Sequence, residues 1–194
     1  MKRITLATAN LDKVTEFRRI LRRYTVELSP APYSIKVLET GRDFIENVII
    51  KAKAYYKEFN VPVLSDDSGL EVDAIGKAPG IFSARFSARF SPDGSYRSNI
   101  DRLLNQIKNI PEEKLNARFV CVVCLIDERG IMHIAQDICE GYIIKEIRGD
   151  SGFGFDPIFY YPELGKTFGE ISSEEKDRVS HRGKALRKLF SVLP

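Results

Sequence analysis

Two adjacent carboxylates, Asp66 and Asp67, are the residues of this sequence with the clearest chemical potential, and they stand in the run SDDSG at residues 65–69. The apolar run at residues 61–64 predicts a strand that ends at the carboxylates, because aspartate is a poor strand former. Carboxylates at the end of a strand are well placed to hold a hard cation such as magnesium. The alternative is an Asx-type turn between two strands, because this composition is also typical of turns.

A set of small and polar residues lies between an expected first strand and the first expected helix: Thr8, Ala9, Asn10, Leu11, Asp12 and Lys13. Backbone N–H groups at such a junction form a natural anion site. Lys13 falls in the first helical turn, where its positive charge opposes the helix dipole unless an anion binds there. The alternative is an ordinary N-cap by Asn10 or Asp12, with Lys13 in solvent.

Two charged residues around the second expected helix extend this chemistry. Glu39 offers a second oxygen ligand for a cation held at Asp67. Lys51, on the helix itself, has a side chain long enough to reach a phosphate. For both residues the alternative is an ordinary solvated side chain.

A glycine-rich loop contains the run Phe153, Gly154, Phe155 and Asp156. Two aromatic rings around a glycine, followed by an acid, are suited to stacking on a flat ring and hydrogen-bonding its edge. The alternative is a pair of core phenylalanines that flank a turn.

Three basic residues near the C-terminus complete the set: Lys176, His181 and Arg182. Ser180 suits the N-cap of the last helix, which places His181 and Arg182 in its first turn. Basic residues are unfavourable there unless they face an anion or an acceptor-rich ligand. The alternative is a surface basic cluster.

Together these groups are the parts of a magnesium–nucleoside triphosphate site: carboxylates, a phosphate loop, stacking aromatics and edge-reading donors. The sequence holds no G-x-x-x-x-G-K-S/T run, so it is not that of a P-loop NTPase. The net charge of +3 permits an anionic small molecule without demanding nucleic acid.

The elements that must position these residues alternate early between strands and helices, and hairpins dominate later. Apolar spacing predicts helices around residues 14–24, 43–59, 100–107 and 185–193. Strands are expected at 2–8, 61–64, 117–126 and 131–147, with a hairpin turn at Gly130. Residues 76–97, with a tandem Phe-Ser-Ala-Arg repeat at 82–89, predict a long irregular segment. This order indicates an α/β or α+β fold with a mixed sheet.

Length and composition suit a globular protein: 194 residues, 43% hydrophobic and 29% charged, are enough for one domain, or one domain with two lobes. No apolar run approaches the length of a membrane span, and the N-terminus lacks a signal-peptide pattern, so we expect a cytoplasmic protein. Three cysteines argue against a disulfide framework. Cys121 and Cys124 stand in a strand-like run and are expected to be buried thiols rather than a metal or redox pair.

Five motifs in this order resemble those of the inosine triphosphate pyrophosphatase family, also called dITP/XTP pyrophosphatases, the house-cleaning enzymes for aberrant purine nucleotides. They are T-x-N-x-x-K-x-x-E at 8–16, E-T-G…E-N…K-A at 39–52, S-D-D-S-G-L-E-V-D-A-I-G…P-G-I-F-S-A-R at 65–85, G-F-G-F-D-P-I-F at 152–159 and E-E-K…S-H-R-G-K-A-L at 174–186. The resemblance covers nearly the whole chain. It departs from the family at Phe155, where many relatives carry tyrosine or tryptophan, and in the doubled repeat at 82–89, which looks like a local insertion.

The resemblance implies a homodimeric enzyme that hydrolyses ITP, dITP and XTP to the nucleoside monophosphate and pyrophosphate. It implies that Asp67 is the general base and that Asp67 and Glu39 hold Mg²⁺. Residues 8–13 and Ser68 would bind the substrate, chiefly its phosphates. The base and sugar would be held by Phe153, Gly154, Phe155, Asp156, Lys176, His181 and Arg182. The implied fold is α/β, a long mixed central sheet flanked by helices, with residues 1–194 forming one domain of two lobes and the active site in the cleft between them.

Arg182 offers a physical reason for the choice of base. Inosine and xanthosine present a C6 keto oxygen beside N7, two adjacent acceptors that a guanidinium fork matches, whereas adenine presents a donor at C6. Two other functions stay open. One is a pyrophosphatase for other modified nucleotides, such as modified pyrimidines, or for dUTP. The other is a nucleic-acid-binding module, against which the near-balance of 27 acidic and 30 basic residues argues.

Overall fold

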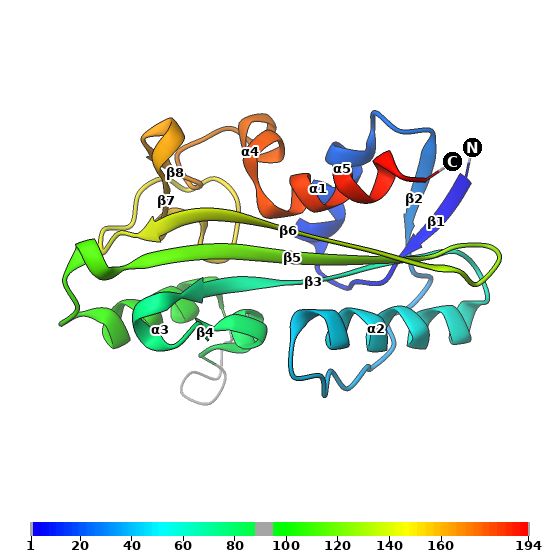
Figure 1. Cartoon of the computed structure of the whole chain (residues 1–194), viewed down its shortest axis with the longest axis horizontal. Coiled ribbons are helices and arrows are strands. Elements are labelled where there is room, and N and C mark those ends of the chain that lie inside the picture. Colours follow the sequence, from blue (N-terminus) through cyan, green and yellow to red (C-terminus); the bar gives the residue numbers. More distant parts are fainter. Residues whose placement is uncertain (1, 88–94, 194) are drawn as a thin grey trace. The chain divides into compact units, whose positions relative to one another are not determined.

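The computed structural model describes residues 2–87 and 95–193, which form a mixed eight-stranded sheet with flanking helices (Figure 1). The strands are β1 Lys2–Leu6, β2 Val26–Pro30, β3 Val63–Val72, β4 Ala78–Pro79, β5 Asn116–Ile126, β6 Met132–Ile143, β7 Phe159–Tyr161 and β8 Lys166–Thr167. Their order is β2-β1-β3-β5-β6-β7-β8, with β4 paired to β3. β1 is parallel to β2 and β3, whereas β7 is antiparallel to β6 and β8. The predicted fold class, α/β with a mixed sheet, is confirmed.

The chain divides into two compact units. Unit 1 comprises Met1–Asp67, Cys121–Asp137 and His181–Pro194, and unit 2 comprises Ser68–Val120 and Ile138–Ser180. Strands β3, β5 and β6 contribute residues to both units. The predicted active site between two lobes stays a prediction.

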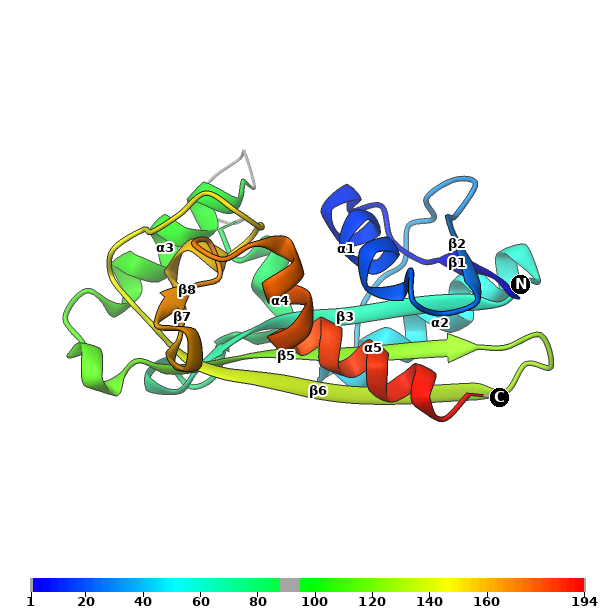
Figure 2. The ribbon, with the colours of Figure 1, turned by 90° about the horizontal axis from the view of Figure 1, so that it is seen from above.

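Unit 1 has helices on both faces of its strands. These helices are α1 Leu11–Leu21, α2 Phe44–Phe59 and α5 His181–Ser191. α1 and α5 lie together on one face, and α2 lies on the other (Figures 1 and 2). The apolar stripe of α1, including Val14 and Phe17, is buried in a core shared with α5 and the sheet. The spacing predicted this helix as far as Tyr24, but α1 ends at Leu21, and Tyr24 packs against the core from beyond the helix.

Unit 2 has its own core, in which aromatic rings pack together among aliphatic side chains. Its helices are α3 Tyr96–Ile107 and α4 Ser173–Val179, with short 3-10 helices at Asp73–Ile75, Gly80–Arg85, Glu112–Lys114, Asp156–Ile158 and Pro162–Leu164. The ring centroid of Phe159 lies 4.6 Å from that of Phe119 and 5.0 Å from that of Phe168. Leu103 and Ile107 of α3 belong to the same core. The helix predicted around 100–107 is therefore confirmed, whereas the seven mostly charged residues of α4 gave no apolar stripe to predict it.

One predicted boundary is wrong, and it concerns the carboxylates. β3 does not end at Asp66 and Asp67 but continues through them to Val72. Both are strand residues, 1% and 7% exposed respectively. Hydrogen bonding of β3 to β1 and β5, together with an ion pair between Asp66 and Lys13, offsets the low strand propensity of aspartate. The turn alternative does not apply to these residues.

Other boundaries also differ from expectation. β2 was not predicted, and β6 ends at Ile143 rather than at residue 147. Within the segment at 76–97, Ser83 Oγ accepts a hydrogen bond from the Leu70 N–H at 2.9 Å and donates to the Gly80 carbonyl at 2.7 Å, which ties the segment to β3. The end of the Phe-Ser-Ala-Arg repeat, residues 88–89, lies outside the described residues.

The hairpin and cysteine predictions are confirmed. Gly130 lies in the turn between β5 and β6, with a positive φ of 76° that glycine adopts without strain. Cys121, Cys124 and Cys139 are buried free thiols, and burial raises the pKa of Cys124 to about 12. No helix of the described residues combines the length and apolar character needed to cross a membrane. The cytoplasmic location stays a prediction.

Candidate functional site

The two adjacent aspartates of β3 have different partners. Successive strand residues point to opposite faces of a sheet. Lys13 of α1 donates from Nζ to Asp66 Oδ2 at 2.7 Å. Lys51 of α2, on the opposite face, donates to the Asp66 backbone carbonyl at 2.9 Å and pairs with Glu39 Oε1 at 2.6 Å. Unit 1 thus brings together the predicted residues Asp66, Asp67, Lys13, Glu39 and Lys51.

A second ion pair is buried beside Asp66. Arg182, in the first turn of α5, donates from Nη1 to Glu16 Oε2, and its Nε lies 3.8 Å from Asp66 Oδ2. Arg182 and Glu16 are each only 2% exposed. The predicted reading of a purine edge by Arg182 stays a prediction, because here the guanidinium contacts carboxylates.

Sequence reasoning did not assign Glu16 to the site. It follows Lys13 by three positions, so both side chains lie on one side of α1. It also stands beside Phe17 and buried Val14, on a helix face where a carboxylate is rarely found without a partner. A charged residue inside an apolar stripe was therefore the available signal.

The surroundings push the pKa values of the two aspartates apart. Burial by itself raises the pKa of Asp66, but the nearby positive charges, above all those of Lys13 and Arg182, outweigh it and hold that pKa well below its usual range. Burial raises the pKa of Asp67 to about 6, and the neighbouring carboxylates Glu39 and Asp66 add to the shift. Carboxylates whose pKa values are separated in this way are typical of acid–base sites. Asp66 is suited to a fixed anion and Asp67 to proton transfer near neutral pH.

The N-terminus of α1 is capped by the side chain of Asn10. Asn10 Oδ1 accepts hydrogen bonds from the N–H groups of Asp12 at 2.9 Å and Lys13 at 3.1 Å, and the Asn10 N–H donates to Thr8 Oγ1 at 3.1 Å. The N-cap alternative therefore holds for Asn10. The solvated position expected in that alternative does not hold for Lys13, which reaches Asp66 instead. Leu11 and Asp12 are exposed.

A small cavity of about 220 Å³ collects several predicted residues of unit 1. Thr8, Ala9, Glu39 and Lys51 line it, in agreement with a site for a charged group beside the strand-to-helix junction. Its wall also includes residues that sequence reasoning missed: Ala7, Ser34, Ile35, Val37 and Tyr55. The segment at 34–37 carried no motif, and only its position in the fold places it here.

The donor set fits a magnesium ion that is held partly by substrate. In the described part of the chain, Asp67 Oδ2 is buried without a hydrogen-bond partner, an arrangement that favours a cation or donor from outside the protein. The same residues contain no group of three or more His, Cys, Asp or Glu arranged to hold a metal. Mg²⁺ commonly takes one or two carboxylates and completes its shell with phosphates and water. Asp67 and Glu39 supply oxygen donors of that kind.

Unit 2 contains a second group of predicted residues. Lys176 Nζ lies 2.5 Å from Asp156 Oδ2, and both residues are buried. The same oxygen accepts the Phe153 N–H at 2.7 Å, and Lys176 Nζ lies 4.7 Å from the centre of the Phe153 ring. Gly152 is required here, because a Cβ on it would lie 2.1 Å from Asp156 Oδ2. Asp156 therefore fixes both a cation and the backbone of an aromatic residue.

The two phenylalanines of the predicted stacking run differ in environment. Phe153 is half-buried, whereas Phe155 is 3% exposed and belongs to the core of unit 2. The core alternative therefore describes Phe155, and its contact with a base stays a prediction. Gly154 between them has a φ of 65°, a left-handed conformation that turns the second ring inward at no steric cost.

The remaining predicted residues lie in three environments. His181 is buried at the start of α5, directly after Ser180. Ser180 ends α4, and its N–H donates to the Lys176 carbonyl at 2.8 Å. Ser68 follows Asp67 on β3 and is half-buried. Substrate contacts of His181 and Ser68 stay predictions.

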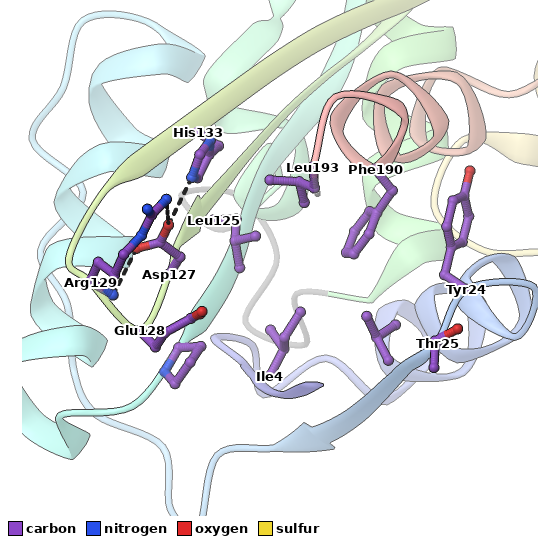
Figure 3. Close-up of a pocket in the computed structure, with 12 residues that line it drawn as sticks. Ile4, Tyr24, Thr25, Leu125, Asp127, Glu128, Arg129, His133, Phe190 and Leu193 are labelled. Atoms are coloured by element: carbon purple, nitrogen blue, oxygen red, sulfur yellow. Dashed lines mark hydrogen bonds and ion pairs between the residues drawn. The ribbon is translucent and has the colours of Figure 1, made fainter. Parts of the chain in front are cut away.

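Unit 1 also contains a larger cavity (Figure 3). It measures about 600 Å³ and is lined by apolar side chains such as Ile4, Leu125 and Phe190. On its rim, His133 Nε2 lies 3.1 Å from Asp127 Oδ2. None of the predicted site residues is among the residues that line it. Cavity size alone therefore does not locate the predicted site residues.

The fold and these two groups define an α/β protein with a buried centre of carboxylates and lysines. Residues 4–192 match the Ham1 family, and the chain belongs to this family. It is 42% identical over 199 residues to the dITP/XTP pyrophosphatase of Bacillus cereus, in a match that covers 100% of this chain and 96% of that protein. The family resemblance predicted from the sequence is confirmed.

Solved structures agree with this assignment. A HAM1 protein from Coxiella burnetii is 36% identical with a TM-score of 0.85, covering 99% of this chain and 98% of that chain. The nucleoside-triphosphatase / dITP/XTP pyrophosphatase of Mycobacterium abscessus is 38% identical with a TM-score of 0.75, covering 96% of this chain and 98% of that one.

Proposed function

We propose that the protein hydrolyses aberrant purine nucleoside triphosphates, ITP, dITP and XTP, to the nucleoside monophosphate and pyrophosphate, and so removes them from the nucleotide pool. Family membership and the relatives named dITP/XTP pyrophosphatase support the substrate class. The observation that carries the proposal is the buried pair of adjacent aspartates, with Lys13 bound to Asp66 and with Glu39 and Lys51 close by. In this arrangement burial raises the pKa of Asp67, and the nearby positive charges lower that of Asp66. Asp67 is thereby suited to accept a proton near neutral pH.

In the proposed mechanism Asp67 accepts a proton from the water that attacks the phosphorus. Asp66 stays ionised and forms an ion pair with Lys13, which holds the ammonium group of Lys13 beside the aspartates of β3. Lys51 is held by Glu39 and by the Asp66 carbonyl beside the small cavity, where a phosphate oxygen would find a positive charge. These contacts hold the ammonium groups of Lys13 and Lys51 in place before substrate binds.

Mg²⁺ belongs to the proposal as the metal cofactor. Asp67 and Glu39 would hold it, and its chemistry would be to neutralise phosphate charge and polarise the phosphoryl group. Among the described residues, Asp67 Oδ2 is buried without a hydrogen-bond partner, and this supports the assignment. Contacts to the base and sugar are proposed for residues 153–156 and Lys176, where the half-buried ring of Phe153 lies beside Lys176, and for His181 and Arg182. A homodimer is also part of the proposal, on the strength of the family resemblance.

A pyrophosphate-release assay tests this function directly. The purified protein is incubated with ITP, XTP, dITP, GTP, ATP and dUTP, each with and without Mg²⁺. We expect release from ITP, dITP and XTP in the presence of Mg²⁺ and little from ATP. Preferential release from dUTP would replace the proposal with the pyrimidine alternative. No release from any nucleotide, together with salt-dependent binding to an oligonucleotide, would replace it with the nucleic-acid alternative. Sedimentation analysis of the same sample tests the dimer.

A further inference from the structure

Phe153, the ring assigned to the base, has an aromatic neighbour that no motif indicated. Tyr96 is the first residue of α3 and follows the N-cap Ser95, whose side chain accepts the Ser98 N–H. The ring centroids of Tyr96 and Phe153 lie 5.8 Å apart at an interplanar angle of 38°. This spacing lies within the range in which aromatic pairs attract each other, about 4.5–7 Å. Both residues belong to unit 2.

The other contacts of Phe153 fix its backbone and place a charge beside its ring. Asp156 accepts its N–H, and Lys176 Nζ lies 4.7 Å from its ring centre. A main-chain hydrogen bond leaves the side-chain torsions of phenylalanine free to rotate. A packed neighbouring ring restricts them. Tyr96 is itself 39% exposed, so the pair of rings presents apolar aromatic surface to ligand or solvent beside a buried ion pair.

We propose that Tyr96 is a positioning residue for base recognition: it holds the Phe153 ring in the orientation in which that ring stacks on the purine of the substrate. The inference rests on the proposed function. Because Tyr96 acts on the base-contacting ring and not on the carboxylates of unit 1, its loss weakens substrate binding and leaves the chemical step intact.

The test compares Tyr96→Ala with Tyr96→Phe, which keeps the ring and removes only the hydroxyl. Tyr142→Ala is the matched control, because Tyr142 also stacks on another ring of unit 2, that of Tyr160 at 4.7 Å, and is not one of the predicted site residues. We expect Tyr96→Ala to raise KM for ITP about 3- to 10-fold, the range that an aromatic pair supplies, with kcat unchanged. Tyr96→Phe and Tyr142→Ala should keep the KM of the unaltered protein.

Inorganic tripolyphosphate separates positioning from general damage to the protein. It carries the phosphates without a base, so its inhibition constant should be the same in the Tyr96→Ala variant and in the unaltered protein. If Tyr96→Ala weakened the binding of ITP and of tripolyphosphate equally, the inference would be overturned. An unchanged KM for ITP would also overturn it. A Tyr96→Phe variant with a KM for ITP as high as that of Tyr96→Ala would contradict it too, because the aromatic ring of Tyr96 would then not be what positions Phe153.

Two other outcomes, an unfolded variant and a protein without pyrophosphatase activity, can be told apart from a failure of the inference. If Tyr96→Ala is unfolded by circular dichroism, Tyr96→Leu fills similar volume without an aromatic face and should show the same rise in KM. An unaltered KM in that variant counts against the inference. Absence of pyrophosphate release by the unaltered protein would instead remove the proposed function itself.

Discussion

Both units bury an aspartate beside a lysine, but they surround the pair differently. In unit 1, Asp66 meets Lys13 and Arg182, and a second carboxylate, Asp67, stands next to it on the same strand. In unit 2, Asp156 pairs with Lys176, whose ammonium group lies near two aromatic rings. The first arrangement brings several charges to adjacent carboxylates, and the second sets an ion pair among aromatic side chains.

This difference separates chemistry from recognition. A cluster with unequal charges can hold one carboxylate ionised while another, desolvated one titrates near neutrality, as proton transfer requires. In the buried pair of unit 2 the two opposite charges offset each other, and the same carboxylate oxygen accepts the backbone N–H of Phe153. We therefore propose that Asp67 of unit 1 serves proton transfer and that the aromatic side chain of Phe153 in unit 2 contributes to holding a flat ring.

The largest effect should follow from Asp67→Asn. Asparagine has the same shape but cannot accept the proton of water, so kcat for ITP should fall about 10²- to 10⁴-fold. Thermal unfolding should be unchanged or slightly higher in temperature, because a buried charge is removed. Asp101→Asn, an exposed aspartate on α3, serves as the control and should keep full activity. Near-normal turnover in Asp67→Asn would remove Asp67 from the catalytic role.

The next effect is on stability and concerns unit 2. Lys176→Met leaves Asp156 buried without its cation and should lower the free energy of unfolding by about 3–5 kcal/mol. The double variant Asp156→Asn/Lys176→Met removes both charges and should recover part of this loss. Urea denaturation measures both. A double variant that is less stable than the single one would contradict the view that the pair mainly neutralises itself.

A smaller effect is expected in the pH dependence of turnover. Asp67 accepts a proton only when ionised, and its pKa is raised to about 6, so kcat should fall as pH drops through about 6, by about tenfold per unit below it. Because the substrate phosphates also titrate, Asp66→Asn is needed as a comparison. Removal of this negative charge should move the acid limb to lower pH, since Asp66 contributes to the raised pKa of Asp67. If the acid limb of the kcat profile stayed at the same pH in Asp66→Asn, the titration would belong to the substrate and not to Asp67.

The smallest effect is expected for a partly exposed ion pair of unit 2, which serves as the reference for the buried pairs. Arg118 Nη2 lies 2.7 Å from Glu71 Oε2 in unit 2, with side chains that are 35% and 16% exposed. Arg118→Met should lower the free energy of unfolding by about 1 kcal/mol or less, because solvent screens such pairs. A loss as large as that of Lys176→Met would show that burial is not what distinguishes the two pairs.

The sequence was most informative where chemistry requires a rare combination of residue types. Asp67, Glu39, Lys13 and Lys51 could be identified from motifs, and the structure brings their side chains into one unit. The helices with clear apolar stripes were also predicted. Glu16 was not assigned, although it ends the motif at 8–16 and stands in an apolar stripe. Tyr96 could not be assigned, because an exposed tyrosine is an ordinary residue until a partner from another element reaches it.

The sequence by itself determined the family, the α/β class and the residue types of the candidate site. Only the tertiary structure decided that Asp66 and Asp67 lie inside a buried strand and not at its end. The reason is that a strand boundary depends on neighbours: β1 and β5 provide the hydrogen bonds, and Lys13 and Arg182 provide the charge that lets two carboxylates stay buried side by side. The division of labour between the two aspartates follows from those contacts, which no local pattern of residues contains.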